Sequence, residues 1–438
     1  MAVTLSETFG LGPLLASCVA CFIFLLGGLA VLWIVRSAPP RTIVIATGPL
    51  GSSFERFADA YQKLLAPHGV TLEILPTSGS LDNLQQLQSA ASRADIGFVQ
   101  GGLTTKETKL GGLVSLGSVA YQPLWIFYRH PTAITRLSEL MNKRIAVGTA
   151  GSGTHVLALA LLAGNGITAE RATYVELEAE AAASDLLAGN IDAVFLMGDS
   201  APQQTLRNLI RVPGIRLFSF TQADGYVRRF PYLNRISLPE GTIDLGKNLP
   251  GQDIILVGPT VELIVRKKLN PALTDLLIEV AQEVHGKAGV MQKRGEFPAP
   301  LEHEFTLSED ALRYYKSGKG FFYRTIRSFW LASLLNRILV AIVPLLLLVL
   351  PAIRLLPVVY RWSIQLKIYR CYRPLLKIER DAAGPLDRER IASLLHRLDE
   401  IEAVVDQLRV PASFADQFYV LRGHLAFVRQ RLKTATPA

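Results

Sequence analysis

The chain has 438 residues, of which 50% are hydrophobic and 19% are charged, and its formal net charge is +9. This length is sufficient for two or three domains. The three cysteines, Cys18, Cys21 and Cys371, all lie outside the segment 41–325, which excludes a disulfide framework and a cysteine-ligated metal site from that segment.

The N-terminal segment 1–36 predicts a membrane anchor. No charged residue occurs between positions 8 and 35, and the apolar run from Leu14 to Val35 is long enough to cross a bilayer as a helix. A cleaved signal peptide is the alternative. It is disfavoured because no basic residue precedes the run, the run is longer than a typical signal core, and no small-x-small cleavage site follows.

The middle segment 41–325 contains an internal repeat. Residues 42–99 and 144–197 each show the order strand, helix, strand, helix, strand, and this alternation predicts parallel βαβ units. We therefore predict an α/β domain with two similar lobes, the second over about residues 125–240. Ligands of open parallel sheets bind beyond the carboxyl ends of the strands, so the predicted site is a cleft between the lobes.

Three turns rich in glycine and hydroxyl side chains precede predicted helices at this cleft, at residues 51–53, 78–80 and 152–154. Each offers backbone N–H groups and a hydroxyl to a carboxylate, and the alternative is that the hydroxyl residues are ordinary helix N-caps. Gln100 is a ligand contact or a solvated loop residue, Tyr121 lines the cleft or packs in the core, and Asp199 faces the cleft or caps a helix. The candidate binding residues are Gly51, Ser52, Ser53, Ser78, Gly79, Ser80, Gln100, Tyr121, Ser152, Gly153 and Thr154.

Other chemistries lack their sequence motifs in this chain. None of the three Gly-Lys pairs is followed by Ser or Thr, which excludes a P-loop, and residues 48–53 do not have the G-x-G-x-x-G spacing of dinucleotide sites. The seven histidines form no metal-binding spacing, and G-x-S-x-G does not occur. We therefore predict no cofactor, no metal and no enzymatic activity.

A second apolar segment, 331–357, predicts a second transmembrane helix, in which three prolines are tolerated. Two spans place both termini on the same side of the membrane. The distribution of lysine and arginine leaves the side open, because Arg36 and Arg41 follow the first span while a longer basic run follows the second.

The C-terminal segment 358–438 combines a basic stretch with a predicted helical hairpin. Residues 358–380 are basic with interleaved aromatic side chains, which suits the headgroup region of an inner leaflet better than a nucleic acid. Residues 387–433 show two apolar stripes with alternating three- and four-residue spacing. A two-helix hairpin buries little surface, so we expect it to pack on a copy of itself, on the segment 358–380, or on a partner.

Six motifs of the middle segment support a resemblance to a known family. They are IVIATGPLGSSF, ILPTSGSLDNLQQLQSAASRADIGFVQ, IAVGTAGSGTHVLALALLAGNGI, FLMGDSAPQQTL, FPYLNRISLPEGTID and ILVGPTVELIVRKKLNPALTDLL. In this order, over residues 41–300, they resemble the solute-binding subunits of TRAP transporters of the TAXI type. The resemblance implies an extracytoplasmic domain of the periplasmic-binding-protein type II fold, whose ligand loops fall on the three turns above and on Gln100.

The resemblance also implies a function. It predicts a membrane-tethered receptor that binds a small organic acid, such as a dicarboxylate or an acidic amino acid, and delivers it to a TRAP-type permease in the cell membrane. On this reading the binding domain lies outside and both termini are cytoplasmic. The alternative is a sensor that signals through its spans to the C-terminal hairpin, and an enzyme is a distant third reading.

Overall fold

The structure of the chain is a computed structural model that describes residues 13–104, 110–301, 303–383, 388–408, 410 and 414–434. The chain divides into two compact units. One comprises Ala38–Leu335, and the other comprises the segments that precede and follow it.

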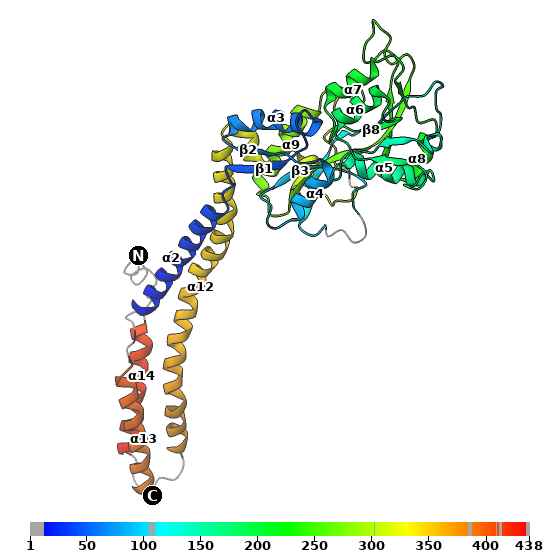
Figure 1. Cartoon of the computed structure of the whole chain (residues 1–438). Coiled ribbons are helices and arrows are strands. Elements are labelled where there is room, and N and C mark those ends of the chain that lie inside the picture. The colour runs from blue at the N-terminus through cyan, green and yellow to red at the C-terminus, as the bar shows by residue number, and fades with distance from the viewer. Residues whose placement is uncertain are drawn as a thin grey trace. The chain divides into compact units, whose positions relative to one another are not determined.

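The first lobe of the unit Ala38–Leu335 is built on a six-stranded mixed sheet (Figure 1). Its order is β10-β11-β3-β1-β2, and β4 also pairs with β11. β1 is parallel to β2 and β3, whereas β11 is antiparallel to its three neighbours. The strands are β1 (Thr42–Ala46), β2 (Thr71–Leu75), β3 (Ile96–Gln100), β4 (Leu113–Tyr121), β10 (Leu233–Leu238) and β11 (Ile254–Arg266).

Helices cover both faces of this sheet. The stripe Phe54, Ala58, Tyr61 and Leu65 of α3 is buried, and the rings of Phe54 and Tyr61 lie 5.4 and 5.7 Å from that of Phe98 in β3. The helices are α3 (Ser53–Leu65), α4 (Ser80–Gln88), α9 (Pro271–His285), α10 (Glu309–Ser317), α11 (Phe321–Thr325) and the short 3₁₀ helix η1 (Ala66–His68).

The second lobe is built on a five-stranded sheet with the order β7-β6-β8-β5-β9. β6 is parallel to β7 and β8, and β5 is antiparallel to β8 and β9. The strands are β5 (Trp125–Tyr128), β6 (Arg144–Ala146), β7 (Thr173–Val175), β8 (Ala193–Leu196) and β9 (Arg216–Leu217). The helices are α5 (Gly153–Gly164), α6 (Ala179–Ala188), α7 (Gln203–Ile210), α8 (Ala223–Arg229) and the 3₁₀ helix η2 (Leu137–Leu140).

The two predicted βαβ units are confirmed, one in each sheet. One helix differs in length. The sequence pattern predicts a helix over residues 81–92, but α4 ends at Gln88. Ser89 then takes an extended conformation, and the Ser92 hydroxyl accepts a hydrogen bond from the Ala94 N–H, so this serine-rich stretch forms a turn instead of another helical turn.

β11 belongs to the cores of both lobes. Ile254 and Leu256, near its start, pack among buried residues of the second lobe, whereas Val261 and Leu263 pack in the first. The connection from β4 to β5 runs beside this strand, where the Leu124 N–H donates to the Val257 carbonyl at 2.9 Å. The lobes are therefore joined along one continuous strand.

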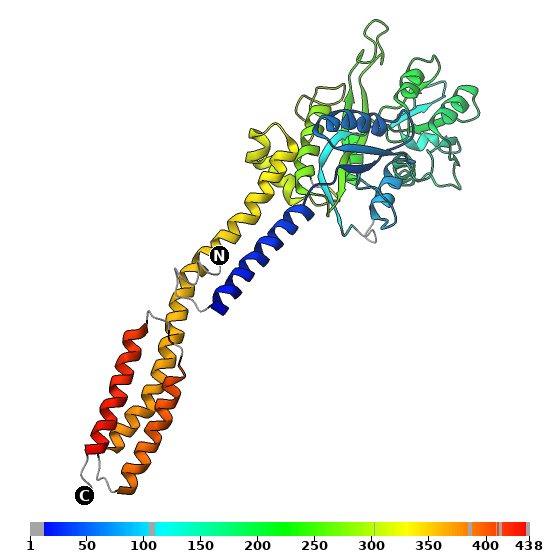
Figure 2. The ribbon, with the colours of Figure 1, turned by 90° about the vertical axis from the view of Figure 1, so that its left-hand side faces the viewer.

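The other unit consists of helices. They are α2 (Pro13–Arg36), α13 (Arg388–Asp406), α14 (Ala415–Thr434) and the greater part of α12 (Phe329–Asp381). Figure 2 shows α12, α13 and α14 side by side, and Leu375, Leu398 and Leu421 from the three helices are fully buried together. The predicted hairpin α13–α14 thus packs on the basic part of α12, which was one of the three expected partners.

One helix among the described residues is long and apolar enough to cross a membrane, the stretch Phe329–Pro351 of α12. It overlaps the second predicted span. The first predicted span, Leu14 to Val35, lies within α2, but the apolar part Phe24–Arg36 of this helix is shorter than a bilayer span. Two spans therefore remain a prediction.

Candidate functional site

The turn that precedes α3 lies against the second lobe. The N–H and the hydroxyl of Ser53 both donate to the Gly198 carbonyl, each at 2.7 Å. Gly51 has a φ of +79°, and a Cβ there would lie 3.3 Å from the Pro202 Cβ, so a larger residue would press on the second lobe. Ser52 is buried and caps the N-terminus of α3.

The turns that precede α4 and α5 meet at the carboxylate of Asp199. One oxygen accepts hydrogen bonds from the Gly153 N–H at 2.6 Å and the Ser80 N–H at 3.4 Å. The other accepts from the hydroxyls of Thr154 at 2.9 Å and Ser200 at 3.0 Å. Ser80 belongs to the first lobe and the other donors to the second. The anion held by these turns is therefore a side chain of the protein itself.

Burial dominates the electrostatics of Asp199. Its side chain is fully buried, and this desolvation raises the pKa of the carboxyl, while the hydrogen bonds from Thr154, Gly153, Ser80 and Ser200 oppose the rise. In the part of the chain that the structure describes, Asp199 forms no ion pair with a basic side chain. Hydrogen-bond donors and helix N-termini alone hold this carboxylate.

Gln100, at the end of β3, also connects the lobes. Its Nε2 donates to the Gly153 carbonyl at 3.0 Å, and its backbone N–H donates to the Ser80 hydroxyl at 3.2 Å. Only 1% of the residue is exposed, and its Oε1 has no hydrogen-bond partner among the described residues. Gln100 is thus a buried contact between the lobes and not a solvated loop residue.

The remaining turn residues shape the same contact. Gly79 has a φ of +129°, and a Cβ there would lie 2.8 Å from Asp199 Oδ2, so the carboxylate needs a glycine at this position. Ser152 is the N-cap of α5. Ser78 lies against Gly151 of the facing turn. The three turns therefore converge, but their convergence leaves little space for a separate ligand.

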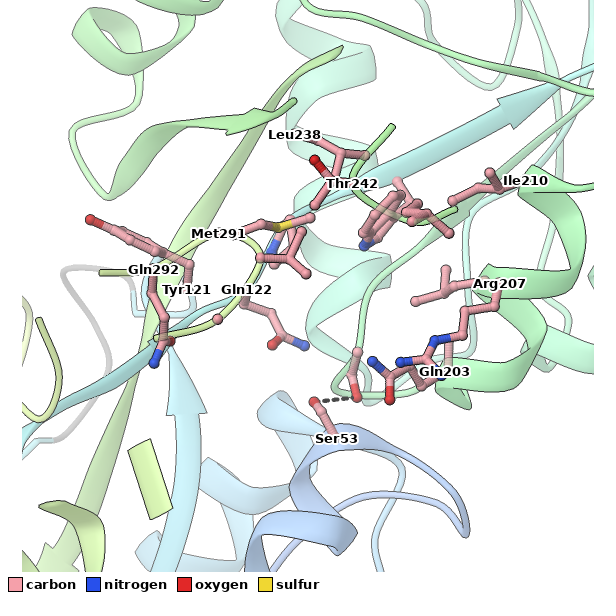
Figure 3. Close-up of a pocket in the computed structure, with 18 of the residues that line it drawn as sticks. Ser53, Tyr121, Gln122, Gln203, Arg207, Ile210, Leu238, Thr242, Met291 and Gln292 are labelled. Carbon is pink, nitrogen blue, oxygen red and sulfur yellow. Dashed lines mark hydrogen bonds between the residues drawn. The ribbon is translucent and has the colours of Figure 1, made fainter. Parts of the chain in front are cut away.

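A cavity of about 480 Å³ adjoins this contact between the lobes (Figure 3). Ser53 and Tyr121 are the two candidate residues that line it. The Tyr121 hydroxyl donates to Glu296 at 2.8 Å, and burial together with this carboxylate raises the pKa of Tyr121 to about 12. Much of the wall is apolar, with the side chains of Trp125, Leu206, Ile210, Leu238, Ile243 and Met291.

Three arginines line the cavity: Arg56 from α3, Arg207 from α7 and Arg211 directly after α7. Within the described residues, none of them has a carboxylate at salt-bridge distance. Arg56 donates a hydrogen bond to Gln203, and in Figure 3 the side chains of Gln203 and Arg207 lie close to Ser53. Burial, and then the charge of Arg207, lower the pKa of Arg56. The arginines thus make the cavity an electropositive site.

These arginines are not among the residues predicted from the sequence. The predicted residues belong to hydroxyl and glycine turns, which bind anions without cationic side chains. The available signal was the four-residue spacing of Arg207, on α7, and Arg211, directly after this helix, together with Arg56 in the first turn of α3. Only the approach of the two lobes brings the three together.

The fold and the site define a two-lobed α/β protein with an arginine-lined cavity between its lobes. The chain belongs to the NMT1-like family, whose model matches residues 45–316.

Several solved structures are similar to this chain. The periplasmic aliphatic sulphonate binding protein SsuA from Escherichia coli is 16% identical, with 56% of this chain and 69% of that chain covered and a TM-score of 0.35. The alkanesulfonate-binding protein SsuA from Xanthomonas axonopodis pv. citri bound to MOPS is 16% identical, with 56% and 74% covered and a TM-score of 0.35. An ancestral arginine-binding protein bound to arginine is 17% identical, with 56% and 92% covered and a TM-score of 0.36.

Proposed function

We propose that this protein is a solute-binding receptor that holds a small organic anion in the cavity between its lobes. The observation that carries the proposal is the group of Arg56, Arg207 and Arg211, which line the cavity without a carboxylate partner in the described chain. A guanidinium binds a carboxylate or a sulfonate through two parallel N–H···O bonds. A bound anion also relieves the repulsion between Arg56 and Arg207.

The wall of the cavity narrows the class of solute. Trp125, Leu206 and Met291 add apolar surface to the cavity that the arginines line, and such surface favours a hydrocarbon part in the solute. The organic acids that the resemblance to TAXI-type subunits implies, dicarboxylates and acidic amino acids, belong to the same wider class. Within it, this cavity favours an acid with an apolar body.

We further propose that the receptor is tethered to the cell membrane by the stretch Phe329–Pro351 of α12 and by the N-terminal segment 1–36. The first of these has a mean hydropathy of 2.4. The binding domain then lies outside, both termini are cytoplasmic, and the solute passes to a TRAP-type permease. The resemblance to TAXI-type subunits supports these points, and the small number of spans requires a separate permease.

Isothermal titration of the full chain in detergent micelles tests the proposed function. The panel contains monocarboxylates with hydrocarbon chains, dicarboxylates, acidic amino acids, sulfonates and neutral sugars. We expect saturable binding of an acid, and Arg207→Gln weakens it by about tenfold or more, because a hydrogen bond to a charged group is lost.

Arg228→Gln is the matched control, because Arg228 is exposed on α8 and does not line the cavity. We expect it to bind the acid as the unmodified protein does. Binding of a sugar instead of any acid, or equal affinity in Arg207→Gln and the unmodified protein, contradicts the proposal.

A sensor is the second candidate function. Phe329, at the start of α12, is buried in the core of the first lobe, and Leu375, later in the same helix, is buried in the core formed with α13 and α14. One continuous helix therefore connects a lobe of the binding domain with the C-terminal hairpin. Co-purification of a permease favours transport, whereas a change in tail association on adding the solute, without a permease, favours sensing.

A further inference from the structure

The N-termini of α4 and α5 come from different lobes and point at the same carboxylate. The N–H of Ser80 and that of Gly153 lie in the first turns of these helices, and both donate to Asp199 Oδ2. Each helix N-terminus carries a partial positive charge. Without an anion between them, the two positive ends face each other and their donors lose a buried acceptor.

The surroundings are complementary to this carboxylate in shape as well as in charge. Gly79 leaves the space that Oδ2 occupies, since a Cβ would lie 2.8 Å from that atom. The hydroxyls of Thr154 and Ser200 complete the donors around Oδ1. The buried Oε1 of Gln100 lies against Gly153, where a Cβ would be 2.3 Å from it, and has no partner among the described residues. The pocket is thus polar, closed and assembled from both lobes.

We infer that Asp199 is an internal ligand: its carboxylate occupies an anion site made by both lobes and holds the lobes together without any bound solute. When its side chain is removed, a free small carboxylate takes the vacated site. This inference goes beyond the proposed function, because it concerns a different site from the arginine-lined cavity. Further contacts at the same lobe boundary, such as the Ser53 bond to Gly198, then depend on this carboxylate.

Rescue by formate tests the inference. The variant Asp199→Ala is made in the full chain in detergent micelles, and its thermal midpoint is measured in sodium formate, sodium acetate and sodium chloride of equal ionic strength. We expect the midpoint of Asp199→Ala in chloride to lie below that of the unmodified protein. In formate or acetate the midpoint of the variant rises with salt concentration above its value in chloride, because a ligand that binds only the folded state stabilises it.

Two matched variants separate site occupation from general salt effects. Asp199→Asn removes the charge but fills the same space, so we expect no response to formate. Asp224→Ala removes an exposed acid of the second lobe, and we expect it to respond as the unmodified protein does. Equal formate and chloride midpoints for Asp199→Ala, or the same formate response in all four proteins, overturns the inference.

A distance measurement tests the contact between the lobes directly. Spin labels are placed at Asp59→Cys on α3 and Glu180→Cys on α6, both exposed, after the three native cysteines are replaced by serine. We expect one short distance in the parent protein without solute, longer distances after Asp199→Ala, and the short distance again in formate. Distances that Asp199→Ala leaves unchanged overturn the inference.

The inference stays testable when Asp199→Ala does not fold in chloride. The variant is then refolded in formate and in chloride, and recovery in formate alone supports the inference, whereas failure in both overturns it. Arg207→Gln leaves Asp199 and its donors intact, so failure of the solute proposal is distinguishable from failure of this one.

Discussion

Glu262 is a buried acid in the middle of β11. Only 1% of it is exposed, and one of its carboxyl oxygens has no partner among the described residues. Burial is the main cause that raises its pKa from 4.5 to about 7; the Ser115 hydroxyl lowers it, and the charge of Glu304 raises it further. The folded protein therefore keeps a proton on Glu262 where the unfolded chain has lost it.

This difference makes stability depend on pH. Because the folded state binds more protons than the unfolded state between about pH 4.5 and pH 7, the contribution of Glu262 to the free energy of unfolding falls as pH rises through that window. Glu262→Gln removes the titration. We therefore expect the thermal midpoint of this variant, relative to that of the unmodified protein, to rise from pH 4.5 to pH 7, and the difference to stay constant above pH 7. A midpoint difference that is the same at every pH contradicts this assignment.

At the scale of single elements, Ser152 acts as the N-cap of α5. Its hydroxyl accepts from the His155 N–H at 3.1 Å and donates to the Thr149 carbonyl at 2.7 Å. We expect Ser152→Ala to cost about 1 kcal/mol in urea unfolding. Ser184→Ala, an exposed serine inside α6, is the control and should stay within about 0.5 kcal/mol. Equal losses in both variants would show that the cap contributes nothing of its own.

At the scale of the whole molecule, the two units have separate cores. Leu398 is fully buried in the core of the helical unit, and Leu161 in that of the second lobe. We expect thermal unfolding in micelles to show two transitions. Leu398→Ala then shifts only the transition of the helical unit to lower temperature, and Leu161→Ala shifts only the other. Each variant lowers the free energy of unfolding of its own unit by roughly 2–5 kcal/mol. A single transition that both variants lower would show that the units unfold together.

Local patterns in the sequence were enough to predict the two βαβ units and the C-terminal hairpin. Apolar alternation and helical spacing depend on neighbours within a few residues, so both βαβ units and the hairpin α13–α14 could be predicted without any long-range information. Turns rich in glycine and serine at the ends of strands likewise identified the edge of each sheet where a site is expected.

Only the tertiary structure decided which groups meet there. Asp199 reaches Ser80 across 119 positions of the chain, and Arg56 meets Gln203 across 147. No local pattern specifies such pairs, because they depend on how the two sheets approach each other along the shared strand β11. The sequence therefore predicted turns suited to an anion. In the folded protein these turns bind the Asp199 carboxylate, and the contact between the lobes forms a separate, arginine-lined cavity beside them, because both depend on residues far apart in the chain.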